Sequence, residues 1–321
     1  MPETGTAAGP TSASQPWETR LEGAPSLAVR VREGSGVPVV LLHGLGRTLE
    51  DWEPVAALLA GRDGAAGAGH HAVYTVDLRG HGLSADGAWS LDACVDDLIR
   101  VIGHFGLEHP VVAGHGLGGV VALMCGARRS DLTAVVGIEV QGRPRAEEIA
   151  GPMGLSPAEA EGPARTAHDY MVEQLTALMS PMPLDSFEQL LKAQRTGPLG
   201  LPGETLEASA LRGSLMGDGL VSPRPGPRAV RALVESYGEY RSSWTQPRLI
   251  VPALSLLSSQ PIPTPPGAPA RYTEVLAAQT AYELAPRGDR ATVTGVDAPH
   301  AMHLTHPALV ARLIEEFLDG V

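Results

Sequence analysis

Residues 114–119, G-H-G-L-G-G, join a short apolar run to a helix-like stretch, and glycines in such a turn can serve two kinds of chemistry. Gly114, Gly116 and Gly119 fit G-x-G-x-x-G, in which a helix N-terminus binds a pyrophosphate. Glu139, twenty residues after Gly119, would then bind a ribose hydroxyl. A dinucleotide-binding fold normally opens with this unit, however, whereas two strand–helix units precede it here. The second interpretation is a strand–turn–helix elbow of the G-x-S-x-G type, in which Gly116 stands where a catalytic serine would be.

The elements that must position this turn alternate between strand and helix. Between residues 37 and 140, β-branched runs alternate with amphipathic stretches, a pattern typical of a mostly parallel sheet with helices on both faces. Strand character returns at 248–257 and 290–296, and a helix is predicted at 307–318. The intervening segment, 141–246, is rich in Pro, Gly and Met and shows helical patches but no clear strands. The predicted organisation is a disordered, polar N-terminus (1–16), an α/β core (17–140 and 247–321) and a helical cap (141–246).

Four separated segments resemble motifs of the α/β-hydrolase superfamily. L-L-H-G-L-G (41–46) is similar to the strand-end oxyanion loop, and D-L-R-G-H-G-L-S (77–84) to the D-x-R-G-x-G-x-S segment. G-H-G-L-G-G (114–119) resembles the nucleophile elbow with only the serine changed. A-P-H-A-M-H-L-T-H-P (298–307) resembles the terminal segment that supplies the catalytic histidine, with Pro299 in place of the usual glycine. The resemblance implies an atypical α/β-hydrolase fold: a mostly parallel central sheet, helices on both faces and a helical cap insertion.

The resemblance implies a catalytic triad of which this chain keeps only a part. Gly116 has no side chain, so the acyl-enzyme route is closed at this position unless Ser258 or Ser259 enters the gap. At the usual acid position the run S-S-Q-P-I has Gln260, a neutral amide that can hold an imidazole but cannot stabilise imidazolium by charge. Some family members draw the acid from the end of the strand after the elbow, where Glu139 stands.

The groups that could still act are a histidine and backbone amides. His300 occupies the position of the family's catalytic base, whereas His303 and His306 are expected to be structural or exposed. The oxyanion hole needs only backbone N–H groups, which the resemblance assigns to Leu45 and Leu117. Such donors stabilise an enolate or alkoxide as well as a tetrahedral acyl intermediate.

The substrate pocket is expected next to these loops, under the cap. The residues predicted to shape it are His43, Gly44 and His115. The Leu, Met and Pro content of the cap indicates an apolar pocket for a medium-sized ligand. Neither a metal nor a cofactor is expected.

Three functions fit this set of residues. In the first, His300 removes a proton from a carbon next to a carbonyl held in the oxyanion hole, giving epimerisation, elimination or cyclisation of a small carbonyl-containing metabolite or peptide. In the second, water occupies the gap at Gly116 and His300 activates it for slow direct hydrolysis. In the third, the pocket binds a ligand or partner without turnover. We expect the first function, proton transfer by His300. Hydrolysis is less expected, because loss of the nucleophile removes most of the hydrolytic rate that a catalytic triad provides. The Ala, Gly, Pro and Arg bias suggests a place in specialised metabolism.

Composition narrows the range of partners. The 321 residues are 43% apolar, which is ample for a large core. A formal net charge of −12 without a Lys/Arg cluster argues against nucleic acid. No apolar run approaches the roughly 18 residues of a membrane span, so no membrane partner is expected. Cys94 and Cys125 support neither a disulfide framework nor a metal cluster and fit the cytoplasm. No motif indicates an oligomeric state.

Overall fold

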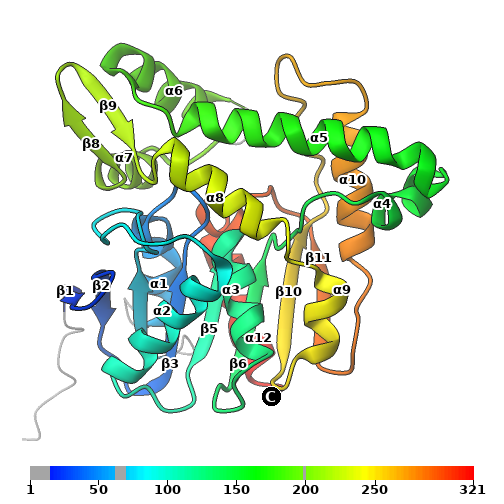
Figure 1. Ribbon diagram of the computed structural model, residues 1–321. Helices are drawn as coiled ribbons and strands as arrows, with labels where there is room; N and C mark the ends of the chain where they lie inside the picture. Colours follow the sequence, from blue (N-terminus) through cyan, green and yellow to red (C-terminus); the bar gives the residue numbers. More distant parts are fainter. Residues whose placement is uncertain (1–14, 62–69, 198–199) are drawn as a thin grey trace, which may run out of the picture.

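The computed structural model describes residues 15–61, 70–197 and 200–321. The segment 1–14, which makes up nearly all of the predicted disordered N-terminus, lies outside the described residues. The described structure has an eight-stranded sheet at its centre (Figure 1).

The sheet is mostly parallel, as the sequence predicts. Neighbouring strands in the run β4–β3–β5–β6–β10–β11 are parallel, and β1 and β2 extend one edge in antiparallel pairs. In spatial order the strands are β1 (Trp17–Leu21), β2 (Leu27–Arg32), β4 (His71–Val76), β3 (Gly36–Leu42), β5 (Val111–His115), β6 (Ala134–Ile138), β10 (Ala253–Ser258) and β11 (Ala291–Val296). The C-terminal ends of the parallel strands therefore lie at one edge of the sheet, where sites form in open α/β folds.

The apolar runs of the sequence form these strands because both faces of the sheet are buried. In β3, Val39 and Leu41 belong to one core cluster, whereas Val40 and Leu42 belong to the other. Successive side chains of a strand point to opposite faces, so the two clusters lie on opposite sides of the sheet. A strand buried on both faces has a continuous apolar sequence in place of an alternating one.

Helices cover both faces of the sheet. The first cluster contains residues of α2 (Leu91–His104) and α3 (Leu117–Gly126), and the second contains residues of α1 (Glu53–Leu59) and α12 (Pro307–Leu318). The hydroxyl of Ser90 accepts a hydrogen bond from the N–H of Ala93 and so caps α2. The remaining core elements are η1 (Leu49–Trp52), η2 (Gln246–Arg248), α10 (Tyr272–Glu283) and α11 (Met302–Thr305). In the described ranges, none of the helices combines the length and the apolar character needed to cross a membrane.

Most of the described part of 141–246, from α4 to α8, lies over the C-terminal edge of the sheet, with one long helix, α5, running across the top in Figure 1, whereas α9 lies lower, beside β10. The helices of 141–246 are α4 (Ala146–Met153), α5 (Pro157–Leu178), α6 (Leu184–Thr196), α7 (Gly203–Arg212), α8 (Pro227–Tyr237) and α9 (Ser242–Thr245). This segment therefore stands between the strand ends and the surroundings.

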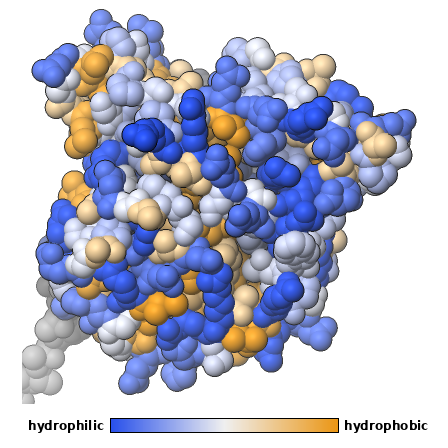
Figure 2. Space-filling model, in the orientation of Figure 1, coloured by the Kyte–Doolittle hydropathy of each residue, from blue (hydrophilic) through white to orange (hydrophobic). Residues whose placement is uncertain are grey.

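The prediction that this segment contains no strands is wrong. It also contains a small antiparallel sheet in the order β7 (Met182–Pro183), β9 (Leu220–Pro223) and β8 (Ser214–Gly217). These strands are two to four residues long, too short for a recognisable period. Leu215 and Met216 on β8 are 60% and 58% exposed, so apolar residues in this strand do not indicate a buried face. The β8–β9 hairpin projects at the upper left of Figure 1, and Figure 2 shows apolar side chains on the surface there.

An ion pair joins α7 to the core. Arg212 Nε donates to Asp77 Oδ2 at 2.8 Å, and the Asp77 carboxylate also accepts hydrogen bonds from the N–H groups of Leu49 and Leu83. Asp77 is fully buried, and Arg212 also pairs with Glu18 at 3.0 Å. A buried carboxylate needs such partners, because desolvation of a charge is costly.

We expect Arg212→Ala to lower the free energy of unfolding by about 3 kcal/mol, because Asp77 would keep its two amide donors but lose its buried counter-ion. The measurement is urea unfolding followed by circular dichroism. The control is Arg195→Ala, which removes an exposed pair with Glu207 and should cost less than about 1 kcal/mol. Equal costs for the two variants would contradict the role given to Arg212.

Candidate active site

The turn at Gly116 has the geometry of a nucleophile elbow. Gly116 has φ 51° and ψ −113° between the end of β5 and the start of α3, a conformation that glycine adopts without the cost paid by other residues. A Cβ at Gly114 would lie 2.2 Å from the backbone of Gly118, so glycine is required there for packing. A Cβ at Gly116 would have Gly44 Cα, at 3.9 Å, as its nearest neighbour. The glycine spacing thus has a structural cause, and there is space at the serine position.

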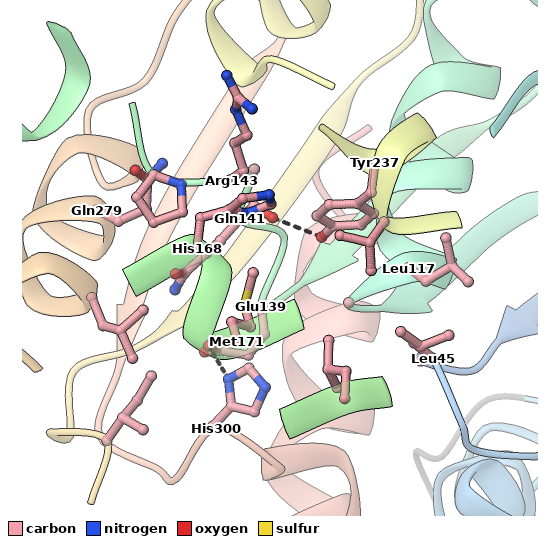
Figure 3. A pocket seen from close by; sticks show the side chains of 18 of the residues that line it. Leu45, Leu117, Glu139, Gln141, Arg143, His168, Met171, Tyr237, Gln279 and His300 are labelled. Atoms are coloured by element: carbon pink, nitrogen blue, oxygen red, sulfur yellow. Dashed lines mark hydrogen bonds and ion pairs between the residues drawn. The ribbon is translucent and has the colours of Figure 1, made fainter. Parts of the chain in front are cut away.

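His300 and Glu139 form a close pair. Nδ1 of His300 lies 2.7 Å from Glu139 Oε2 (Figure 3). The other carboxylate oxygen, Oε1, accepts a hydrogen bond from the N–H of Ser258, and the N–H of Glu139 donates to the carbonyl of Leu256 at 2.9 Å. Glu139 is 3% exposed and has φ 54°, which is uncommon for a residue with a side chain. Because Nδ1 faces the carboxylate, Nε2 is left to exchange a proton with a substrate.

The structure does not bring Gln260 to His300. Gln260 is exposed, and its Nε2 donates to Asp297 Oδ1 at 3.0 Å. The residue at the usual acid position is therefore turned toward the surface, and the carboxylate beside the imidazole comes from Glu139 at the end of β6.

The hydroxyls that could replace the missing serine are engaged elsewhere. Ser258 Oγ donates to the carbonyl of Ala298 at 2.6 Å, and Ser259 Oγ donates to the carbonyl of Val296 at 3.2 Å. Neither residue lines the cavity at Gly116. The possibility that one of them enters the gap thus finds no support in these contacts.

The two residues whose backbone amides are expected in the oxyanion hole lie at the same cavity. Leu45 and Leu117 both line it, and among the described residues neither N–H has a hydrogen-bond partner. Leu117 is the first residue of α3, where the positive end of the helix dipole adds to the attraction for a negative oxygen. The arrangement suits an oxygen on which negative charge develops.

Two buried imidazoles support the loop that carries Leu45. His43 Nδ1 donates to the carbonyl of Gly44 at 2.8 Å, and its Nε2 accepts the N–H of Leu78 at 3.0 Å. His81 Nε2 accepts the N–H of Gly46 at 3.0 Å. Burial lowers the pKa of His43 and lowers that of His81 well below its usual value, so both rings are held in the neutral form that these bonds need.

His43 thus lies beneath the loop and does not line the cavity, in contrast to the prediction, whereas Gly44 and His115 do line it. The supporting role of His81 was not foreseen from the sequence, although the D-L-R-G-H-G-L-S motif contains this residue.

A second group of histidines packs behind the elbow. The rings of His115 and His303 have centroids 4.2 Å apart, and those of His115 and His300 are 5.2 Å apart. Burial, together with the neighbouring imidazoles His303 and His300, lowers the pKa of His115 well below its usual value. His303 is buried near Asp51, while His306 is exposed. His115 and His303 are therefore neutral rings that pack against the site.

The cavity has a volume of about 770 Å³ and is largely apolar, in the range typical of small-molecule sites (Figure 3). Its apolar lining comes from Leu45, Leu117, Met171, Leu175, Leu233, Val234, Ile262, Pro263, Pro265, Pro266, Tyr272 and Leu276. Both the cap and the proline-rich loop after β10 contribute to this wall. Within the described ranges, no group of three or more His, Cys, Asp or Glu side chains is arranged to hold a metal ion.

Comparison with known sequences identifies a family. The sequence pattern of the Alpha/beta hydrolase family matches residues 39–313. The chain is 32% identical over 92 residues to the sn-1-specific diacylglycerol lipase ABHD11 of Danio rerio, which is 28% of this chain and 27% of that protein. It is 32% identical over 104 residues to the (E)-2-((N-methylformamido)methylene)succinate hydrolase of Acinetobacter baylyi, 31% of this chain and 36% of that protein. The matched region thus spans well under half the length of these curated relatives.

Solved structures show the same fold over nearly the whole chain. The crystal structure of E-2-(acetamidomethylene)succinate hydrolase has a TM-score of 0.69 at 20% identity and covers 95% of this chain and 100% of that one. The thioesterase domain from the curacin biosynthetic pathway has a TM-score of 0.65 at 19% identity, covering 94% and 100%. At these identities the likeness concerns the fold alone.

We expect Gly116→Ser to create esterase activity on activated short-chain and medium-chain esters, about a hundredfold or more above the unchanged protein, because the hydroxyl would lie beside an oriented imidazole. The measurement is release of a chromophoric alcohol. Gly116→Ser/His300→Ala should lose this gain.

The matched pair Gly116→Ser/Glu139→Gln and Gly116→Ser/Gln260→Ala separates the two acid positions. Only the former should lose most of the new activity, because only Glu139 contacts His300. Loss in the Gln260 variant, with activity retained in the Glu139 variant, would contradict the geometry described above.

Proposed function

Because the chain belongs to the alpha/beta hydrolase family, we propose that it is an enzyme of this fold that works without an acyl-enzyme, using His300 as a general base on a carbonyl compound. The observation that carries the proposal is the 2.7 Å contact between His300 Nδ1 and Glu139 Oε2 beside a glycine elbow. The base and its orienting carboxylate are present, and the nucleophile is absent.

The proposed reaction is proton transfer at the carbon next to the carbonyl. Nε2 of His300 takes the proton, and the electron pair of the C–H bond forms an enolate whose oxygen accepts hydrogen bonds from the N–H groups of Leu45 and Leu117. The buried Glu139 carboxylate stabilises the imidazolium that results. If the enolate turns over in the cavity before His300 returns the proton to the same carbon, the result is epimerisation. If a leaving group departs from the neighbouring carbon with its bonding electrons and takes the proton from His300, the result is elimination. If the enolate carbon attacks a second carbonyl of the substrate, whose oxygen then takes the proton from His300, the result is cyclisation.

The apolar cavity supports this chemistry in two ways. Hydrogen bonds to a developing negative charge are stronger where water is scarce. The volume of about 770 Å³ suits a small or medium-sized metabolite or a short peptide. We propose a carbonyl-containing substrate of this kind, which is consistent with a place in specialised metabolism.

Direct hydrolysis is the second candidate, and the space at Gly116 favours it. Apart from the adjacent residues of the chain, the nearest neighbour of a Cβ there would be Gly44 Cα at 3.9 Å, so we propose that a water molecule stands in this space. His300 Nε2 would take one proton from this water while its oxygen attacks the carbonyl carbon, and the leaving group would take the proton afterwards. The curated relatives reported above are a diacylglycerol lipase and an (E)-2-((N-methylformamido)methylene)succinate hydrolase, which supports this alternative.

We expect the protein in D2O to exchange the proton next to the carbonyl in a panel of apolar ketones and esters, and His300→Ala to slow this exchange about a hundredfold or more. Mass spectrometry of the recovered compounds measures the exchange. Glu139→Gln should slow it by less, and Gln260→Ala should leave it unchanged.

The same panel in ¹⁸O-labelled water separates the two candidates. Direct hydrolysis would place ¹⁸O in the carboxylate of a product, and this labelling would be lost in His300→Ala. If it occurs without deuterium exchange, direct hydrolysis replaces proton transfer as the function. If no compound acquires deuterium or ¹⁸O, both proton transfer and direct hydrolysis are contradicted. Ligand binding without turnover is then favoured.

A further inference from the structure

Arg143 lies on the loop that follows Glu139 and lines the same cavity. Figure 3 places it at the opposite end from His300, with its guanidinium directed away from the imidazole. The loop is held from two sides: Tyr237 Oη donates to the carbonyl of Gln141 at 2.7 Å, and Gln141 Nε2 donates to Thr280 Oγ1 at 3.0 Å. The position of the Arg143 backbone is therefore fixed relative to the catalytic end of the cavity.

The guanidinium of Arg143 forms no ion pair within 4.0 Å among the described residues, although Asp169, Glu173 and Glu235 line a second hollow beside it. Arg241 pairs with Glu147 at 3.0 Å, and the buried Arg145 lies 3.8 Å from Glu148. Burial lowers the pKa of Arg145, and the charges of Arg241 and Arg143 contribute in the same direction. Two arginines line the apolar cavity; Arg47 pairs with Asp51 at 2.6 Å, and Arg143 is the one without an ion pair among the described residues.

An imidazole without a hydrogen-bond partner stands at the same end. His168, on α5, lines the cavity, and its Nδ1 is buried with no partner in the described structure. Burial and the charge of Arg143 lower its pKa, so the ring is neutral near pH 7. Arg143, His168 and Val234 also line the second hollow, which lies between α5 and α8, so the two groups stand where the apolar cavity meets a more polar one.

We propose that the substrate carries a carboxylate that binds Arg143, while its carbonyl lies at the amides of Leu45 and Leu117 and its apolar body fills the cavity. This inference rests on the function proposed above and adds the class of substrate: an oxo acid or acyl acid with its two polar groups at opposite ends. An unpaired guanidinium can bind a carboxylate through two charge-assisted hydrogen bonds. The protein as a whole has a formal net charge of −12, so an anion needs such a local cation to bind here.

The test is calorimetric binding of a series of straight-chain keto acids, in which increasing numbers of methylene groups separate the ketone from the carboxylate, and of their methyl esters. We expect one chain length to bind best, with the acid about tenfold tighter than its ester. Arg143→Gln should abolish this preference, and Arg143→Lys should keep part of it. Added salt should weaken the preference, because the arginine is exposed.

The control is Arg228→Gln, which removes an exposed arginine on α8 that lines neither hollow and should leave the preference unchanged. Equal binding of acids and esters by the unchanged protein, or a preference that survives Arg143→Gln, would overturn the inference. Binding is measured without turnover, so a failure of proton exchange with the acid preference intact would count against the proposed function and not against this subsite.

Discussion

The hydrogen bond between Glu139 and His300 is the interaction on which the chemistry proposed for this protein depends. It is made possible by the parallel register of β5, β6 and β10, which places the elbow, Glu139 and Ser258 at one edge of the sheet. Glu139 is held by its own N–H, by the amide of Ser258 and by a left-handed backbone, so its carboxylate has little freedom to turn elsewhere. Because position 116 is glycine, the proposed base His300 has no serine hydroxyl to deprotonate. It would therefore act directly on the bound substrate.

The surroundings of Gly116 have the features that the proposed chemistry needs. The turn has a positive φ, the N–H groups of Leu45 and Leu117 have no hydrogen-bond partner among the described residues, and two neutral imidazoles, His43 and His81, support the loop that carries Leu45. The joint presence of these features beside an apolar cavity, which Arg143 also lines, supports the proposed chemical role.

The sheet and the family could be predicted from the sequence because buried parallel strands are continuous apolar runs and because four motifs occur in the family's order. The two acid positions show where sequence reasoning reaches its limit. Gln260 and Glu139 both follow strands, and only the turn geometry decides that the first faces solvent and the second the imidazole. The strands β7 to β9 were missed because they are only two to four residues long. The absence of a partner for Arg143 could not be predicted either, because the nearby Glu147 pairs with Arg241 from a distant segment.

The most direct test of the account is the tautomer of His300, determined by ¹⁵N NMR of histidine-labelled protein at a pH where the ring is neutral, with the signal assigned through His300→Ala. The account predicts that the proton resides on Nδ1, donated to Glu139, and that Nε2 is bare; Glu139→Ala should convert the ring to a mixture of tautomers. A proton on Nε2, or a mixture that Glu139→Ala leaves unchanged, would contradict the claim that Glu139 orients His300 as a base.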